Sequence, residues 1–193
     1  MEQQHFQREH SVKEERVLVL DFLPNGYPLD PRPSHKKTAV VQAIGKDHFT
    51  VLELIPKKGI TLKLMQELYI GADKRDEIQQ IVGRLPLHKL TGTAKQELEF
   101  VIKEIIHSTP EKFIAFFNKA QPLSTRMHQL ELLPGLGKKH MWEILEARDE
   151  KLFESFADIK ARVKLMPDPE KLIVKRVISE LEGSEKYNLF VDR

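Results

Sequence analysis

The chain has 193 residues, 40% hydrophobic and 31% charged, and a net charge of +2 at pH 7. This is enough for a packed core in one or two domains, and no apolar run approaches the roughly 18 residues of a membrane-spanning helix. Cysteine is absent, which excludes a disulfide framework and a cysteine-based zinc site. The polar start of the chain holds no signal-peptide core, so we expect a cytoplasmic protein. Because the charge is nearly balanced, a nucleic-acid site must be a local patch.

After a flexible segment of residues 1–12, the first half of the chain has a β pattern. Short runs rich in β-branched residues alternate with Gly and Pro turns. The expected strands are residues 16–22, 37–44, 48–55 and 61–70, and residues 76–82 form a fifth strand or a short helix. The pattern predicts a small barrel of the oligonucleotide-binding (OB) type over residues 13–89, with a small sandwich as the alternative.

Four cations lie near the ends of the expected strands. They are Lys57, Lys58, Lys74 and Arg75. Loops at the open face of an OB-like barrel often hold nucleic acid, with aromatic rings for stacking, and Phe49 and Tyr69 are the available rings. We favour the alternative that Phe49 belongs to the core and that the lysines keep the turns soluble.

The second half, residues 90–193, has the apolar spacing of α-helices. One helix begins at Thr93. A second begins after Thr109 as N-cap, with Pro110 at its first position. It contains Phe113, Ile114, Phe116 and Phe117, and we assign the aromatic rings to the core rather than to a base-stacking platform.

Residues 130–145 hold the most informative motif. Gly135 and Gly137 follow Pro134, apolar residues at helical spacing flank them on both sides, and the pattern resembles the helix-hairpin-helix, a nucleic-acid-binding unit without sequence specificity. Glycines let the backbone approach a ligand, and a turn that opens a helix presents free N–H groups and the positive end of the helix dipole to a phosphate. The expected contact residues are Pro134, Gly135, Leu136, Gly137, Lys138 and Lys139.

Two features of this motif leave alternatives open. Met141 stands where the helix-hairpin-helix usually has a small residue, so the helices cross more loosely or Met141 fills a gap. An ordinary helical corner with a glycine C-cap has a similar sequence, and a true hairpin serves only protein packing in some proteins.

A second, degenerate hairpin is expected over residues 159–181. Asp168 is suited to cap its second helix, Pro169 fits the first turn and Gly183 ends it. This copy lacks the two glycines, so we expect a structural role. Basic residues gather around it as a secondary patch or a solvated face: Lys160, Arg162, Lys164, Lys171, Lys175 and Arg176.

Over nearly all residues after Arg16, the chain is similar to an uncharacterised archaeal family to which RNA or nucleotide binding is ascribed. The similarity rests on residues 21–26, 32–33, 42–45, 49–50, 69–71, 74–75 and 90–91, together with the hairpin. It implies an α+β protein of two domains, an N-terminal OB-like barrel and a C-terminal helical domain with the helix-hairpin-helix. It implies no demonstrated enzymatic activity.

We expect a binding protein for RNA or DNA, not an enzyme, with no cofactor, no metal and no membrane partner. The histidines show no metal-ligand spacing and no phosphate-binding Walker motif is present. A protein–protein adaptor in a translation or transcription assembly is one alternative. A base-excision DNA glycosylase is another. However, the glycosylase signature after the hairpin is missing, and the helical part is too small to enclose a flipped base.

Overall fold

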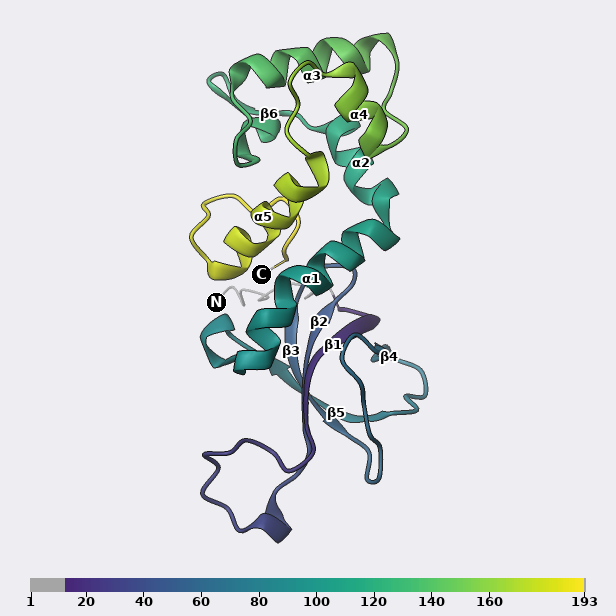
Figure 1. Cartoon of the computed structure of the whole chain (residues 1–193), viewed down its shortest axis with the longest axis vertical. Coiled ribbons are helices and arrows are strands. Elements are labelled where there is room, and N and C mark those ends of the chain that lie inside the picture. The colour runs from purple at the N-terminus through teal and green to yellow at the C-terminus, as the bar shows by residue number, and fades with distance from the viewer. Residues whose placement is uncertain (1–12, 193) are drawn as a thin grey trace, which may run out of the picture.

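The computed structural model describes residues 13–192; residues 1–12, for which the sequence predicts a flexible segment, lie outside this range. The fold is mixed α+β, with a curled five-stranded antiparallel sheet that forms a half-barrel and with five helices. The molecule is elongated: the sheet lies towards one end, α3 lies at the other, and α1 and α5 lie between them (Figure 1). None of the helices within residues 13–192 is both long and apolar enough to cross a membrane.

The sheet has the strand order β4-β1-β2-β3-β5. Its strands are β1 (Arg16–Leu23), β2 (Val40–Gly45), β3 (Val51–Pro56), β4 (Glu67–Tyr69) and β5 (Ile78–Arg84). The expected strands are therefore confirmed with shifted ends, and residues 76–82 belong to a strand rather than a helix. The strand expected at 61–70 shrinks to three residues because Met65 adopts a φ of 62° and the Gln66 N–H closes a turn on the Lys63 carbonyl at 3.2 Å.

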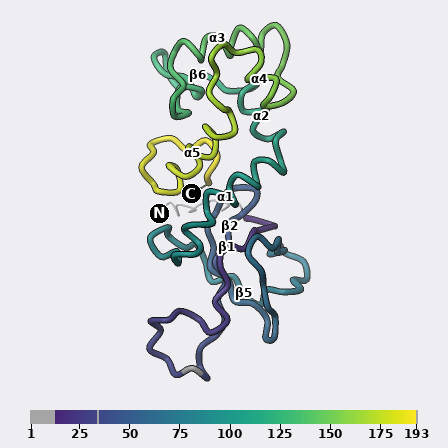
Figure 2. Tube along the Cα trace, viewed as in Figure 1, coloured from purple at the N-terminus to yellow at the C-terminus, as the bar shows by residue number. Residues whose placement is uncertain are grey.

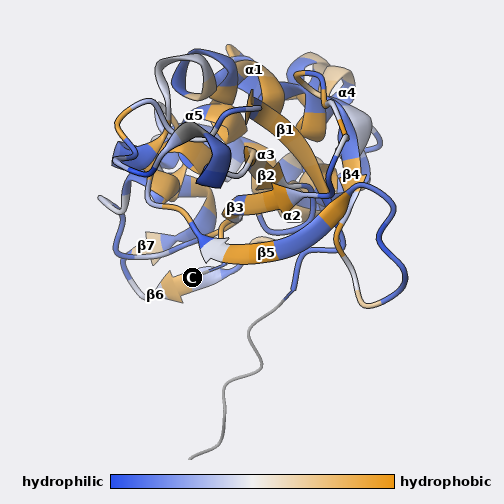
Figure 3. Cartoon of the chain, turned by 90° about the horizontal axis from the view of Figure 1, so that it is seen from below, coloured by the Kyte–Doolittle hydropathy of each residue, from blue (hydrophilic) through white to orange (hydrophobic). Residues whose placement is uncertain are grey.

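Both faces of β1 are buried, since successive side chains of a strand point to opposite faces. Val17 and Val19 face the interior of the half-barrel, and Leu18 and Leu20 face the helices. Hydrophobic residues accordingly dominate β1 in the hydropathy view (Figure 3). The sheet thus has two apolar faces. One lines the interior of the half-barrel, and the other is covered by helices.

The helices are α1 (Gly92–Ser108), α2 (Pro110–Lys119), α3 (Lys138–Glu150), α4 (Phe156–Arg162) and α5 (Pro169–Glu182). Between α2 and α3 lie a two-stranded ribbon of β6 (Pro122–Ser124) and β7 (Met127–His128) and the 3-10 turn η3 (Gln129–Leu132). Two further 3-10 turns are η1 (Ser34–Lys36) and η2 (Leu87–Lys89). Thr91 caps α1, whereas the Thr109 hydroxyl donates to the Ile105 carbonyl at 2.9 Å and leaves α2 without a side-chain cap.

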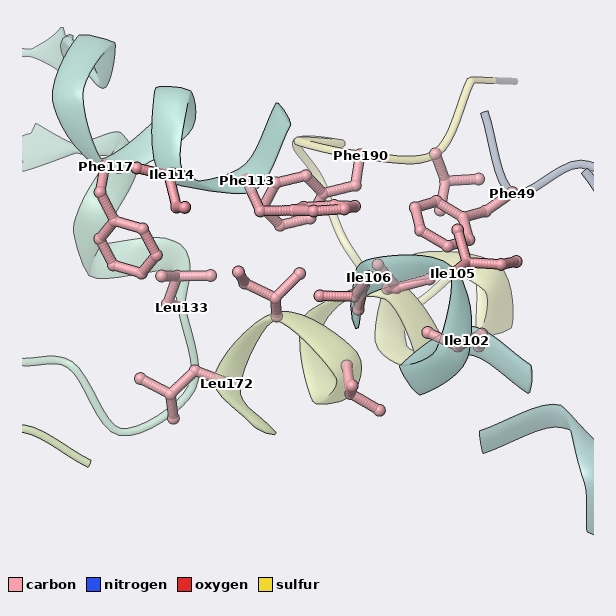
Figure 4. Close-up of a cluster of buried hydrophobic side chains, with 14 of the residues drawn as sticks. Phe49, Ile102, Ile105, Ile106, Phe113, Ile114, Phe117, Leu133, Leu172 and Phe190 are labelled. Atoms are coloured by element: carbon pink, nitrogen blue, oxygen red, sulfur yellow. The ribbon is translucent and has the colours of Figure 1, made fainter. Parts of the chain in front are cut away.

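One hydrophobic core runs from the sheet into the helices (Figure 4). Phe113 and Phe117 are fully buried, which confirms their assignment to the core. Phe113 lies between Phe49 and Phe190, with ring centroids 6.1 Å and 5.6 Å away. The core therefore continues across residue 90, where the sequence predicts the boundary between two domains.

Residues 24–39, between β1 and β2, extend away from the sheet (Figure 2). Tyr27 anchors them, because its hydroxyl donates to Glu53 and accepts from Gln42 Nε2 at 3.0 Å. Burial and the adjoining Glu53 raise the pKa of Tyr27 to about 12. Gln42 also donates to the Lys89 carbonyl at 3.2 Å and accepts the Thr91 N–H at 2.9 Å, so one amide group ties this excursion to the start of α1.

The turn between β2 and β3 closes around the buried carboxylate of Glu14. This group accepts the N–H groups of Asp47 at 3.0 Å, His48 at 3.1 Å and Thr50 at 2.9 Å. It lies where a side chain at Gly45 would be, since a Cβ built there falls 1.8 Å from the Glu14 carboxyl carbon. A side chain at position 45 would therefore displace the Glu14 carboxylate from its hydrogen bonds.

We expect Gly45→Ala to lower the free energy of unfolding by about 1–3 kcal/mol, because the added methyl overpacks the Glu14 site. Gly92→Ala is the matched control, since a Cβ at Gly92 meets no atom within 4 Å. Urea denaturation of both variants measures the difference. Equal stability of the two would contradict the role given to Glu14.

Candidate nucleic-acid interface

The glycine loop, residues 134–137, lies exposed at the start of α3. Two leucines anchor it from below: Leu133 and Leu136 are buried in the core, and the Leu136 N–H donates to the Leu133 carbonyl at 3.1 Å. Gly135 adopts a φ of 88°, in the left-handed region that glycine tolerates best. The anchoring leaves the rest of the loop backbone at the surface.

The first turn of α3 is open to a ligand. Gly137 is its N-cap, and no side chain within residues 13–192 caps the helix. The helices α1, α4 and α5 differ, since Thr91, Ser155 and Asp168 cap them. A Cβ built at Gly137 meets no atom within 4 Å. Unpaired N–H groups at a helix start attract anions, and the exposed Lys138 and Lys139 add positive charge beside them.

The segment before the glycine loop is not the α-helix that the helix-hairpin-helix pattern predicts. Only the 3-10 turn η3 is present, because residues 122–128 pair as the β6–β7 ribbon instead. His128 caps η3: its Nδ1 accepts the Leu130 N–H at 3.1 Å, and Glu131 accepts the His128 N–H at 2.8 Å. After the loop, Met141 is buried in the core.

The second loop, residues 163–168, joins α4 to α5 and lies against the first turn of α3. His140 Nε2 lies 3.3 Å from the Leu165 carbonyl oxygen. Asp168 accepts the N–H groups of Glu170 at 3.1 Å and Lys171 at 3.2 Å, as the sequence predicts. Gly183 ends α5 with a φ of 79°, also as predicted. A carboxylate therefore occupies the helix start of α5 where a phosphate would bind.

The predicted position of Arg176 in an exposed basic patch is wrong. Its side chain is only 3% exposed. The guanidinium pairs with Glu180 at 2.7 Å and Glu185 at 2.8 Å and donates to the Leu132 carbonyl at 2.9 Å. These contacts remove Arg176 from any surface and make it a buried support beneath η3.

Arg162 is also engaged within the protein. It pairs with Asp158 at 3.3 Å, donates to the Lys151 carbonyl at 2.8 Å and lies over the ring of Phe153. The remaining members of the predicted patch are exposed: Lys160, Lys164, Lys171 and Lys175. Lys164 is the one that adjoins Leu165, and so lies beside the start of α3.

The barrel cations lie in the other half of the molecule from the glycine loop (Figure 1). Lys57 donates to the Arg75 carbonyl, and the Arg75 guanidinium donates to the Gly71 carbonyl at 3.0 Å, so both close their own loops. Lys58 and Lys74 are exposed. Phe49 is fully buried, which confirms it as core and removes it as a stacking ring.

Two residues that the sequence did not single out lie beside the glycine loop. Trp142 follows Lys138 by one helical turn and is exposed, and His128 belongs to β7 of the ribbon and is buried. Together they line a groove between the ribbon and α3. Trp142 carried a usable signal, since an aromatic residue among charged neighbours on a helix breaks the apolar pattern. Throughout residues 13–192 no group of three or more His, Asp or Glu side chains is placed to hold a metal ion.

A model of the family described as "Protein of unknown function (DUF655)" matches residues 13–192. The chain belongs to the DUF655 family. It is 41% identical over 180 residues to the uncharacterized protein MJ0038 of Methanocaldococcus jannaschii, covering 92% of this chain and 80% of that protein. The crystal structure of Af1531 from Archaeoglobus fulgidus has a TM-score of 0.86 and 47% identity and covers 93% of this chain and 100% of that one. These relatives establish family and fold.

Burial, aided by the nearby charge of Arg148 and opposed by Glu131, lowers the pKa of His128. A lowered folded-state pKa means that this residue's contribution to stability is present above the ordinary value near 6.5 and is lost as the pH falls through the folded-state pKa. We expect an NMR titration to give His128 a pKa below that ordinary value. His128→Gln assigns the signal by its loss, and a raised pKa would contradict the geometry.

Proposed function

We propose that this protein binds nucleic acid without sequence specificity and without catalysis, through the glycine loop, which resembles a helix-hairpin-helix in sequence and whose backbone amides would contact phosphate. The observation that carries the proposal is the uncapped first turn of α3 beneath an exposed glycine loop. Backbone N–H groups at such a site favour an anion. Lys138 and Lys139 supply cations at the same place.

The contrast between the two loops supports this assignment. Both precede a helix, and the second loop contacts the first turn of α3 through Leu165 and His140. Asp168 fills the second helix start with a carboxylate, whereas Gly137 leaves the first one open. This difference supports a pair of hairpins in which the first binds phosphate and the second has a structural role.

The sheet supports an OB-like half. Its order, β4-β1-β2-β3-β5, would close into a five-stranded barrel if β4 met β5, as in partly open OB barrels. Of the four loop cations singled out from the sequence in this half, Lys58 and Lys74 are exposed to solvent. Because Lys57 and Arg75 are engaged in their own loops, we assign the principal contact to the glycine loop.

Contacts between backbone amides and phosphate determine which nucleic acids the protein can tell apart. Amide–phosphate hydrogen bonds carry no base information, and phosphate is common to RNA and DNA, so the proposal covers both. A protein–protein adaptor remains the competing proposal. It predicts no affinity for an oligonucleotide, which makes direct binding the discriminating measurement.

We expect Gly137→Ala to weaken oligonucleotide binding on the order of tenfold, because the methyl blocks one or two charge-assisted hydrogen bonds. Gly137 has a φ of −97° and ψ of 179°, which alanine also adopts. Gly135→Val is less suitable, since the φ of 88° there would strain any branched residue. Fluorescence anisotropy with a labelled oligonucleotide gives the affinities.

Gly92→Ala is the control for that experiment. Gly92 is also exposed, at the start of α1, and a Cβ there meets no atom within 4 Å. Thr91 already caps that helix, so the control should bind like the unmodified protein. Unchanged binding by Gly137→Ala, with the fold intact by circular dichroism, would refute the glycine loop as the site.

A further inference from the structure

A groove of about 430 Å³ separates the β6–β7 ribbon from α3, and Lys138, directly after the glycine loop, forms part of its wall. Two large side chains in its lining are open to solvent: Trp142 is 60% exposed and Met127 is 41% exposed. Trp142 is the single tryptophan of the chain. Exposed aromatic and thioether groups that line one concave surface mark it as a binding surface for a flat apolar group.

His128 supplies a polar group to the same groove. Its side chain lines the groove although the residue is only 5% exposed. Nδ1 accepts the Leu130 N–H at 3.1 Å, so the hydrogen of the neutral ring lies on Nε2. Nothing in the described range 13–192 accepts that hydrogen. The largely buried ring therefore presents its Nε2–H to the groove, where solvent or a ligand can accept it.

The charge around the groove is positive. The cations Arg126, Lys138 and Arg148 are present with one acid, Glu131, whose carboxylate accepts the His128 N–H at 2.8 Å. Arg148 donates to two backbone carbonyls, which leaves Arg126 and Lys138 available at the rim. This balance favours an anionic ligand over a basic or neutral one.

The spacing connects the groove to the anion site. Lys138 and Trp142 are four residues apart on α3, so they share a face with Cβ atoms about 5–6 Å apart. A group held at the first turn of α3 is thus close to the indole ring. A nucleotide has this arrangement, since its phosphate and its base are joined through one sugar.

We infer that the groove binds a nucleobase that is unstacked from its strand, with its ring against Trp142 and one of its acceptor atoms on the His128 Nε2–H, while Lys138 contacts the phosphate. The inference rests on the proposed function and specifies its ligand as single-stranded or locally unpaired nucleic acid. An intact duplex keeps its bases stacked and paired, and does not offer one to the groove.

The test compares two strands with equal numbers of phosphates, an oligothymidylate and an abasic oligomer of the same length, by fluorescence anisotropy with the full chain. We expect the oligothymidylate to bind about five- to a hundredfold tighter, the range that stacking of a base contributes. It should also quench the fluorescence of Trp142, whereas the abasic strand should not.

Trp142→Ala should remove this preference and leave abasic binding unchanged. Phe100→Ala, which removes a 51% exposed ring from α1 outside the groove, should retain it. Equal binding of both strands by the unmodified protein would overturn the inference and leave the proposed function standing. A preference that survives in Trp142→Ala would place the base elsewhere. Binding of neither strand would overturn both the inference and the proposed function.

Discussion

The helical half depends on a buried ion pair between Arg176 and Glu180 of α5. Glu180 is 1% exposed and accepts Arg176 Nε at 2.7 Å. Backbone N–H groups of Leu189, Phe190 and Val191 also donate to it, at 2.7–3.0 Å. Burying two charges is costly unless their hydrogen-bonding groups are satisfied, and here they are. Because Arg176 also reaches the Leu132 carbonyl, the pair fixes the turn that leads directly into the glycine loop.

The same pair connects the loop to the sheet. Glu180 holds the chain end so that Phe190 packs on Phe113 and Phe116, with ring centroids 5.6 Å and 5.1 Å away. Phe113 in turn contacts Phe49 of the half-barrel (Figure 4), and α1 lies between the sheet and α5 (Figure 1). A phosphate-binding loop made of backbone needs a rigid base, since amides bind best when they are already in place. The continuous core provides that base without a side chain entering the site.

Local signals in the sequence predicted much of this fold. Asp168 and Gly183 mark the ends of α5 by their chemistry alone, and the aromatic face of α2 identifies core residues. Arg176 was misplaced because its neighbour Lys175 has the same charge and only packing separates them. The spacing Leu172, Arg176, Glu180 on one apolar face was the available signal. The β6–β7 ribbon was not predictable, since two short strands are set by tertiary contacts, and neither the groove nor the free Nε2 of His128 follows from sequence alone.

The claim that backbone amides of the glycine loop bind phosphate is tested most directly by amide NMR during titration with an oligonucleotide. The account predicts that the N–H signals of Gly137, Lys138 and Lys139 shift progressively to saturation. The N–H signals of Glu170 and Lys171 serve as an internal reference, because Asp168 already occupies them. Shifts confined to the barrel loops around Lys58 and Lys74, with the glycine loop silent, would contradict the account.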